Sequence, residues 1–503
     1  MKNTIVILVS ILCFTIALGE NTSKDYEKAK SLTKIGISHL LNFEFGKANE
    51  IFDEVIKNYP DYPQAYISKS ALPMWKFLFG KSSEDYSEAI KLVDKAIQVS
   101  EAFAEKNKKD PHALTSLGIA YGNRVFIKLR NENYLGMVFD LRKSYSAFNE
   151  AVRINPNYYD AYLGLGIYHY SIGSLPKALK WIISLLGFEG NIEKGLKEIE
   201  LAAEKGNFQK VEAEFYLTQF YPWHTGEFDR AKIIINNLLQ QYPENQIFLY
   251  TSGVFNINLN YVDSAMNDFL KIKNQKYYPI PKLFEFTLFR LGECNFKLGK
   301  YNLAIDYYKE FLKSYNEEIY ITQAFLNLGI ALEFTNKREE ALQYYNRATK
   351  SKSKYGDDLY AKHMANNFIK NRIGEVDSLI IVARNYHKSG KYLQALAIYN
   401  SLLKRGNIGD TQENEILFRY GECCYDAKMY DDAKMNFIKI IDKKPEQSSW
   451  LIPWSKFYLG QINLKSGNQY VAKNYFIDVL NHSNYLNERW LRYRTERTLK
   501  LLN

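Results

Sequence analysis

The chain has 503 residues, a formal net charge of +10, and a high aromatic content, with 40 Tyr and 30 Phe against only 12 Pro. This composition excludes a disordered or low-complexity chain, because such chains lack the apolar side chains that a core requires. Lys and Arg alternate with Asp and Glu along helical segments, so the basic excess indicates solvated helix faces and argues against nucleic acid as a partner.

Residues 1–19 have the layout of a secretory signal peptide. Lys2 precedes an apolar run from Ile5 to Leu18, and small residues precede a predicted cleavage after Gly19. The run of about fourteen residues is shorter than the ~20 that a membrane-spanning helix needs. We therefore expect a periplasmic or secreted protein without a transmembrane helix in the mature chain. Peripheral association with the envelope stays open.

Helical hairpins are predicted from residue 25 onwards. In the stretch Glu285–Phe311, apolar residues fall at helical spacing on both sides of Gly299, which marks the turn. Gly292 in the first helix precedes Ala304 in the second by twelve positions, and the two backbones are expected to approach there. The same offset recurs, with a bulky residue four positions further on, at Gly36–Ala48–Phe52, Gly166–Ala178–Ile182, Gly253–Ala265–Phe269, Gly329–Ala341–Tyr345, Ala383–Ala395–Tyr399, Gly421–Ala433–Phe437 and Gly460–Ala472–Phe476.

This pattern, with Pro after the second helix at Pro60, Pro156, Pro243 and Pro445, resembles the tetratricopeptide repeat (TPR) family. The resemblance implies an all-α fold, a right-handed α-solenoid of TPR-like helical hairpins whose first helices line a concave groove. We expect the following organisation: 1–19 signal peptide, 20–206 irregular helical region, 207–355 TPR array, 356–375 connecting segment in which an extra helix is left open, and 376–503 C-terminal array with a capping helix.

The segment from Ser171 to Gly206 departs from the plain repeat. Ala178 is followed by Gly195 after only seventeen positions, so a third helix is predicted from about Pro176 to Leu186. The segment resembles the tetratricopeptide repeat protein 39 family and the related inclusion-body clearance proteins, which are adaptor-like proteins. The matching residues are Leu175, Pro176, Leu185, Gly187, Phe188, Gly190, Gly195 and Leu196, while Ser174 departs from the family pattern.

No catalytic or metal-binding motif is found in the sequence. The seven histidines are scattered, and Cys294, Cys423 and Cys424 occupy helical positions typical of small packing residues. No nucleophile elbow, phosphate-binding loop or zinc motif occurs. We therefore predict a protein that is not an enzyme and that needs no cofactor and no metal.

The predicted function is a protein-interaction scaffold or adaptor of the cell envelope that binds a protein or peptide partner in the concave groove. An enzymatic or carbohydrate-handling envelope component built on a helical frame is the alternative. Aromatic and Arg side chains are the types that most often anchor protein ligands. By the family's geometry, the predicted contact residues are Arg384, Phe418, Arg419, Tyr425, Trp454 and Tyr458.

Overall fold

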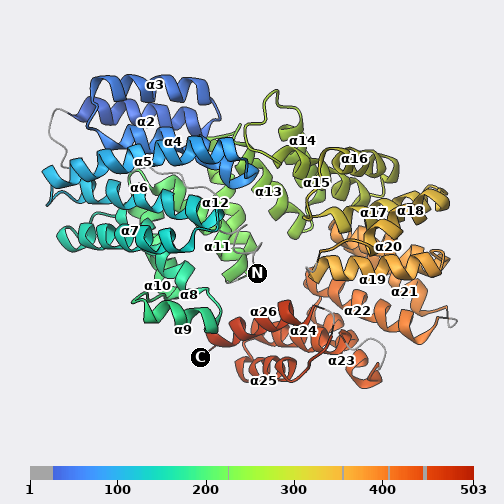
Figure 1. Ribbon diagram of the computed structural model, residues 1–503. Coiled ribbons are helices and arrows are strands. Elements are labelled where there is room, and N and C mark those ends of the chain that lie inside the picture. The colour runs from blue at the N-terminus through green and yellow to red at the C-terminus, as the bar shows by residue number, and fades with distance from the viewer. Residues whose placement is uncertain are drawn as a thin grey trace. The chain divides into compact units, whose positions relative to one another are not determined.

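The computed structural model describes residues 26–224, 226–353, 356–405, 408–445, 450–485 and 487–502. Regular structure in these ranges is helical throughout, without a strand (Figure 1). Consecutive helices form hairpins, which confirms the predicted all-α solenoid of TPR-like hairpins. The predicted signal peptide, residues 1–19, lies outside the described residues.

The chain divides into two compact units, Met1–Ser252 with Gln275–Leu283, and Gly253–Asn274 with Phe284–Asn503. The N-terminal unit contains α2 (Glu27–Leu41), α3 (Phe45–Asn58), α4 (Pro63–Gly80), α5 (Ser83–Lys106), α6 (Pro111–Arg130), α7 (Tyr134–Ile154), α8 (Ala161–Gly173), α9 (Lys177–Leu185), α10 (Ile192–Lys205), α11 (Lys210–His224), α12 (Phe228–Gln241) and the first part of α13 (Gln246–Asn258). The C-terminal unit contains the rest of α13, α14 (Val262–Lys273), α15 (Leu283–Lys297), α16 (Tyr301–Ser314), α17 (Ile321–Phe334), α18 (Arg338–Thr349), α19 (Gly356–Lys370), α20 (Glu375–Lys388), α21 (Tyr392–Leu403), α22 (Asp410–Asp426), α23 (Tyr430–Lys443), α24 (Leu451–Lys465), α25 (Gln469–Leu480) and α26 (Glu488–Leu501).

The predicted close contacts between hairpin helices have one geometry. The bulky residue of the second helix lies directly over the glycine of the first, so that a Cβ atom at Gly292 would lie 2.8 Å from the ring of Tyr308. A larger residue would push against the ring of Tyr308, which is fully buried. The same arrangement joins Gly36 to Phe52, Gly253 to Phe269, Gly329 to Tyr345, Gly421 to Phe437 and Gly460 to Phe476.

Helices α5, α6 and α7 of the N-terminal unit lack this register. They have 24, 20 and 21 residues, against 14 in each of α16 and α17. Here one ring packs against two glycines. A Cβ atom at Gly118 would lie 2.8 Å from the ring of Phe148 in α7, and one at Gly164 would lie 2.2 Å from it. The repeat pattern does not indicate this contact, since the spacing between the residues follows no repeat period.

Helix α9 is the third helix predicted in the segment 171–206, and α10 follows it. The pairing of Gly166 with Ala178 is wrong, because α8 packs against α10 instead. A Cβ atom at Gly166 would lie 2.7 Å from the carbonyl oxygen of Gly195, and one at Gly195 would lie 2.5 Å from the backbone nitrogen of Tyr170. Two glycines facing each other bring the backbones of α8 and α10 together, and α9 is left at the periphery.

The segment 356–375, left open between a connection and a helix, contains α19. Beyond α19, the C-terminal unit makes contacts over a long sequence separation. Asn385 of α20 donates to the backbone carbonyl of Phe296 at 3.0 Å, and Ser389 donates to that of Lys297 at 3.0 Å. These carbonyls belong to the last turn of α15, and that of Phe296 also accepts from the backbone N–H of Gly299 at 3.0 Å. The first helices of separate hairpins are thereby tied together inside the unit.

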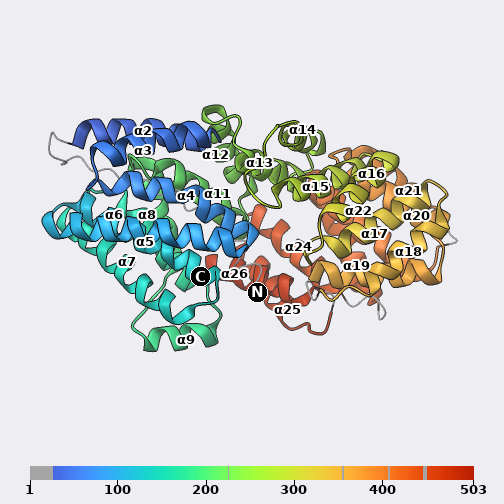
Figure 2. The same ribbon diagram turned by 45° about the horizontal axis from the view of Figure 1, so that its top comes forward.

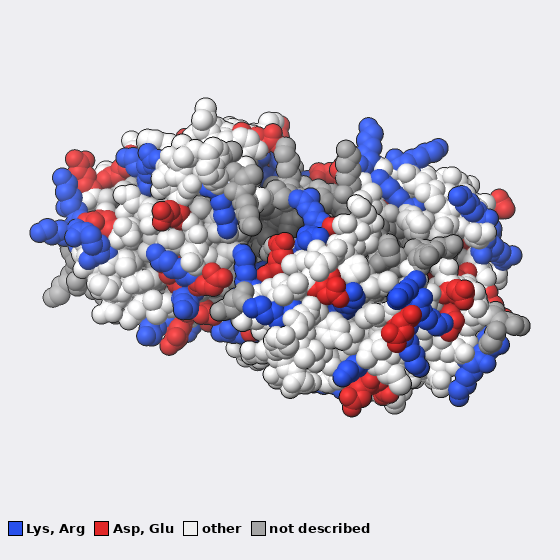
Figure 3. Space-filling view, turned by 90° about the horizontal axis from the view of Figure 1, so that it is seen from below, with Lys and Arg blue, Asp and Glu red and all other residues white. Residues whose placement is uncertain are grey.

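Charges of both signs are interspersed on the face shown in Figure 3, and no extended field of one sign is seen there. This agrees with the alternation of charged residues in the sequence. Among the described residues, no helix has the length and apolar character that crossing a bilayer demands.

Candidate binding surface

A network of charged side chains joins α20 and α22 in the C-terminal unit. The Glu422 carboxylate accepts a hydrogen bond from the guanidinium of Arg419 at 3.0 Å. The ammonium nitrogen of Lys388 lies 3.4 Å from a carboxylate oxygen of Glu422 and 3.4 Å from one of Asp426. His387, fully buried, completes the network through a 2.8 Å contact between its Nε2 and Asp426 Oδ2. We call these five residues the α20–α22 charge network.

The network keeps its carboxylates ionised. Burial would raise the pKa of Glu422, but Lys388 and Arg419 outweigh burial and hold that pKa well below its usual range. Burial and the neighbouring Lys388 lower the pKa of His387, while its hydrogen bond to Asp426 opposes them. The network is therefore a set of mutually paired charges, and Arg419 and Lys388 are already matched by carboxylates.

Aromatic side chains of α22, α24 and α26 lie next to this network. Tyr458 links the two groups. Its hydroxyl donates a hydrogen bond to the Glu422 carboxylate at 3.3 Å, and its ring stacks on that of Phe437 with 5.0 Å between the ring centres. The rings of Tyr425 and Tyr458 pack edge to face with 5.0 Å between their centres, and Trp454 stacks on Trp490 with 5.6 Å between the ring centres. Trp490 of α26 is 44% exposed. We call Tyr425, Trp454, Tyr458, Trp490 and Arg494 the C-terminal aromatic cluster.

Arg494 is the cation of this cluster. Its guanidinium lies 4.5 Å from the centre of the Trp490 ring and 4.9 Å from that of Phe457. Burial lowers its pKa, opposed by Tyr458 and Tyr425. In the part of the chain that the structure describes, no carboxylate forms an ion pair with this guanidinium. An arginine whose charge is matched only by aromatic rings can still pair with a carboxylate of a ligand.

The structure brings four of the six predicted contact residues into the network or the cluster. Tyr425, Trp454 and Tyr458 belong to the cluster and Arg419 to the network, while Arg384 donates to the hydroxyl of Tyr360 at 3.4 Å. Phe418 differs, because it is only 2% exposed and packs in the core against Trp450 and Phe437. It supports the surface from behind and offers no area to a ligand.

Sequence reasoning missed Trp490 and Arg494. Both lie on α26, the capping helix, which follows the last hairpin and has no small-residue offset to place its side chains. The usable signal was the alternation of aromatic and basic residues in Trp490, Tyr493, Arg494 and Arg497.

The three cysteines of the described chain are unsuited to nucleophilic chemistry. Cys294, Cys423 and Cys424 are fully buried and free. Burial raises the pKa of each thiol to about 12, and the thiolate is the reactive form. In the described part of the chain, no three His, Cys, Asp or Glu side chains are placed to hold a metal ion.

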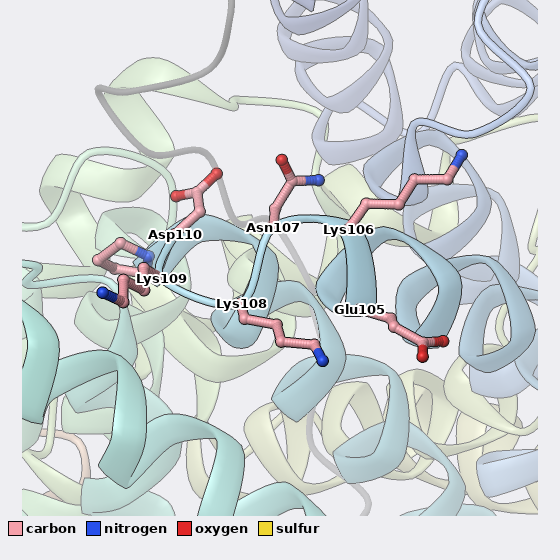
Figure 4. A pocket seen from close by; sticks show the side chains of 7 residues that line it. Glu105, Lys106, Asn107, Lys108, Lys109 and Asp110 are labelled. Atoms are coloured by element: carbon pink, nitrogen blue, oxygen red, sulfur yellow. The ribbon is translucent and has the colours of Figure 1, made fainter.

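Two hollows of the N-terminal unit are shallow and each is lined by neighbouring residues of one segment. The first, of about 540 Å³, surrounds the turn between α5 and α6 and is lined by Glu105 to Pro111. Figure 4 shows Lys106, Asn107 and Asp110 extending to one side of this turn, with Glu105 and Lys108 on the other. Side chains from different elements do not converge there, so this hollow lacks the arrangement of a catalytic pocket.

Comparison with known proteins agrees with this architecture. The family model Iml2/Tetratricopeptide repeat protein 39 matches residues 160–359, and a Tetratricopeptide repeat model matches residues 24–62. The chain is a TPR protein related to the tetratricopeptide repeat protein 39 family. A TPR repeat-containing protein of Methanocaldococcus jannaschii is 26% identical over 237 residues, which are 41% of this chain and 41% of that protein. The match thus spans less than half of the relative's length.

Similar solved structures include the human IFIT1 dimer with PPP-AAAA, which is 17% identical, covers 77% of this chain and 96% of its own, and has a TM-score of 0.37. The apo form of the quorum sensor NprR from B. thuringiensis is 12% identical, covers 84% of this chain and 99% of its own, and has a TM-score of 0.35. TPR arrays are frames for protein interaction, because stacked repeats create extended binding surfaces.

Proposed function

We propose that this TPR protein is a non-catalytic scaffold of the cell envelope that binds a protein or peptide segment through its C-terminal repeats and the capping helix α26. The observation that carries the proposal is Arg494. Its guanidinium lies over the rings of Trp490 and Phe457 and pairs with no carboxylate of the described chain. A partner's carboxylate would supply the missing charge, and the exposed face of Trp490 would supply apolar contact area.

The charged and aromatic groups have different parts in this proposal. Arg419 and Lys388 are held by Glu422, so a ligand would have to displace an existing ion pair to use them. Arg494 needs no such exchange. We therefore assign ligand contact to Trp454, Trp490 and Arg494, and we assign to the α20–α22 charge network the role of fixing Tyr458 beside them.

The location in the envelope is the second part of the proposal, and it rests on the apolar run and small residues that precede position 20. N-terminal sequencing of the protein from its native host should give a chain that begins at Glu20. A mature chain that begins at Met1 would contradict this location without affecting the proposed binding surface.

The binding surface is tested by crosslinking and pull-down from the native envelope with the parent and a Trp490→Ala, Arg494→Gln double variant. Arg419→Ala is a poor test, because it would leave the half-buried Glu422 with one cation fewer and disturb the fold. Tyr470→Ala is the matched control, since Tyr470 is 79% exposed on the second helix α25.

We expect the parent and Tyr470→Ala to recover the same partner, and the double variant to recover at least roughly tenfold less of it at unchanged thermal stability. Equal recovery by the double variant would contradict the assigned surface. Turnover of a glycan or peptide by the purified protein, without recovery of a partner, would contradict the scaffold itself.

A further inference from the structure

Two turns of the C-terminal unit that lie far apart in the sequence meet through polar side chains. Asn260, in the turn between α13 and α14, donates hydrogen bonds to a carboxylate oxygen of Asp426 at 3.1 Å and to the hydroxyl of Tyr392 at 3.3 Å. Asn260 and Asp426 are 166 residues apart in the sequence. The backbones approach as well, because a Cβ atom at Gly390 would lie 3.0 Å from the carbonyl oxygen of Asn260. The start of the unit is thus tied to α20, α21 and α22 (Figure 2).

The end of α15 takes part in the same contact. Asn385 of α20 and Ser389, just after that helix, donate to backbone carbonyls of α15, both at 3.0 Å. A single side-chain hydrogen bond contributes little net stability, so contacts of this kind can open while the hairpins on both sides stay folded. We call the groups that meet here the polar seam: Asn260, Asn385, His387, Ser389 and Asp426.

One oxygen of Asp426 is the centre of the polar seam. This oxygen, Oδ2, accepts from Asn260, lies 2.8 Å from Nε2 of His387, and lies 3.4 Å from the ammonium nitrogen of Lys388. An ionised carboxylate only accepts hydrogen bonds, so Nε2 of His387 carries the proton of the neutral ring and donates it. The polar seam and the α20–α22 charge network therefore share His387 and Asp426.

The other ring nitrogen of His387 favours the neutral form of the side chain. The side chain is fully buried, and its Nδ1 has no hydrogen-bond partner among the described residues. A second proton on the ring would create a buried N–H without an acceptor and a charge without water around it. Burial and Lys388 accordingly lower the pKa of His387, against the opposing effect of Asp426 and Glu422. The closed polar seam thus holds the ring in its neutral form.

The ionisable groups that face His387 keep their charges between pH 7.5 and 5.5. On its own helix, the pKa of Lys388 is raised, because Glu422 and Asp426 outweigh burial. On α22, Lys388 and His387 outweigh burial and lower the pKa of Asp426, and Glu422 is likewise held ionised. On α21, burial raises the pKa of Tyr392, whose ring centre is 6.0 Å from that of His387. The amide from the turn between α13 and α14 carries no charge.

From this arrangement we infer that the polar seam is a pH-sensitive latch, which is closed while His387 is neutral and opens when the ring takes up a second proton. In the open state the ring reaches water and can be protonated at the ordinary histidine pKa, near 6.5. By linkage, the population of the open state rises by up to roughly tenfold for each pH unit below 6.5. Opening frees the turn between α13 and α14 and the end of α15 from α20 and α22.

This inference does not depend on the proposed scaffold function, because the polar seam is a contact within the chain. Its test uses the purified protein without a partner, whereas the scaffold is tested by recovery of a partner. The two proposals can therefore fail separately.

The test is amide hydrogen exchange of the full chain at pH 7.5 and 5.5, corrected for the effect of pH on the chemical exchange rate. We expect residues 259–261 and 298–300 to exchange several-fold and up to roughly tenfold faster at pH 5.5. Exchange in α25, which lies outside the polar seam, should not change. All of these segments belong to the C-terminal unit, so a general loosening of the unit would be seen in α25 as well.

His387→Gln should abolish the acid response, because the Gln amide can still donate to Asp426 but does not titrate. The matched control is His363→Gln, since His363 is an exposed histidine of α19 in the same unit. This control should keep the response of the parent.

Asn260→Gly opens the latch from the other side. Asn260 has a φ of 64°, a conformation that Gly adopts readily, so the substitution removes the side chain without straining the turn. We expect fast exchange in residues 259–261 at both pH values. This variant keeps the inference testable if His387→Gln does not fold.

The ring signals of histidine-labelled protein give a second readout by nuclear magnetic resonance. The signal of His387 is identified by its loss in His387→Gln. We expect its pKa to lie below 6.5 in the parent and to rise towards 6.5 in Asn260→Gly, because the open state no longer opposes the proton.

Three results would overturn the inference. The first is equal exchange of the parent in residues 259–261 at the two pH values. The second is an acid response in His387→Gln as large as that of the parent, which would assign the response to another group. The third is a pKa of His387 at or above 6.5 in the parent, which would mean that the closed polar seam favours the charged ring.

Discussion

The regular hairpins of the C-terminal unit and the segment α8 to α10 of the N-terminal unit bring pairs of helices into close contact in different ways. In α15 and α16, the close contact is a ring over a glycine, with Tyr308 on Gly292. In α8 and α10, it is backbone against backbone, with Gly195 on Gly166 and Tyr170. A ring can tilt, whereas a helix backbone has to move as a whole. The second contact should therefore tolerate far less added volume.

The largest expected effect comes from the backbone contact. Gly195→Ala would place a Cβ atom 2.5 Å from the backbone nitrogen of Tyr170 and 2.7 Å from the carbonyl oxygen of Gly166. Because neither atom can rotate away, the two helices would have to separate, and we expect a loss of about 3 to 5 kcal/mol in the free energy of unfolding. Denaturant unfolding followed by circular dichroism measures this loss. A loss below that of Gly292→Ala would contradict the distinction between the two contacts.

The charge pairs of the C-terminal unit predict a dependence on acid. Glu293 accepts from Arg290 at 2.6 Å and from Lys297 at 2.8 Å. Burial would raise the pKa of Glu293, but Lys297 and Arg290 lower it from 4.5 to about 2. The folded state thus binds fewer protons than the unfolded state, so this stabilisation is complete above pH 4.5 and is lost as the pH falls towards 2.

We expect the ion pairs of Glu293 to account for a fall on the order of 2 kcal/mol in the free energy of unfolding over that range. Glu293→Gln should reduce stability near neutral pH and flatten the dependence below pH 4.5. Denaturant unfolding at a series of pH values measures both effects. The same acid dependence in parent and variant would mean that Glu293 is not held ionised by its two partners.

The matched change in the regular hairpin should have the smallest effect. Gly292→Ala would bring a Cβ atom within 2.8 Å of the Tyr308 ring, which can give way by a small tilt. We expect a loss of about 1 to 2 kcal/mol, partly offset by the better helix propensity of Ala. Gly46→Ala is the control, because Gly46 lies in α3 with open space around its Cβ position and should gain about 0.5 to 1 kcal/mol. Thermal unfolding of both variants should show Gly292→Ala less stable than the parent and Gly46→Ala more stable.

The repeat period predicted the hairpins and their contacts wherever one helix follows another at a constant offset. Tyr308, Tyr345, Phe437 and Phe476 lie where the offset places them. The period could not predict Phe148 between Gly118 and Gly164, because α6 and α7 are longer than the repeat and shift the contact. Nor could it predict that α10 replaces α9 beside α8, since that choice depends on Gly195 facing Gly166 in space.

The candidate binding surface was predicted in part, for a related reason. The offset indicates which positions of a first helix face the same way, and it placed Tyr425, Trp454 and Tyr458 together correctly. It does not indicate how deeply a position is buried, so Phe418 was included although it lies in the core. It also does not extend to the capping helix, so Arg494, whose guanidinium pairs with no described carboxylate, was missed.

Site-specific photocrosslinking tests the proposed binding surface most directly. A photoreactive residue in place of Trp490 would sit in the C-terminal aromatic cluster, and one in place of Leu393 would sit on the second helix α21, where the side chain is 77% exposed. Irradiation in the native envelope should give a protein adduct from position 490 that disappears when Arg494→Gln is added, and no adduct of that mass from position 393. Equal adducts from both positions, or an adduct from position 393 alone, would contradict the assignment of the C-terminal aromatic cluster as the surface that binds a partner.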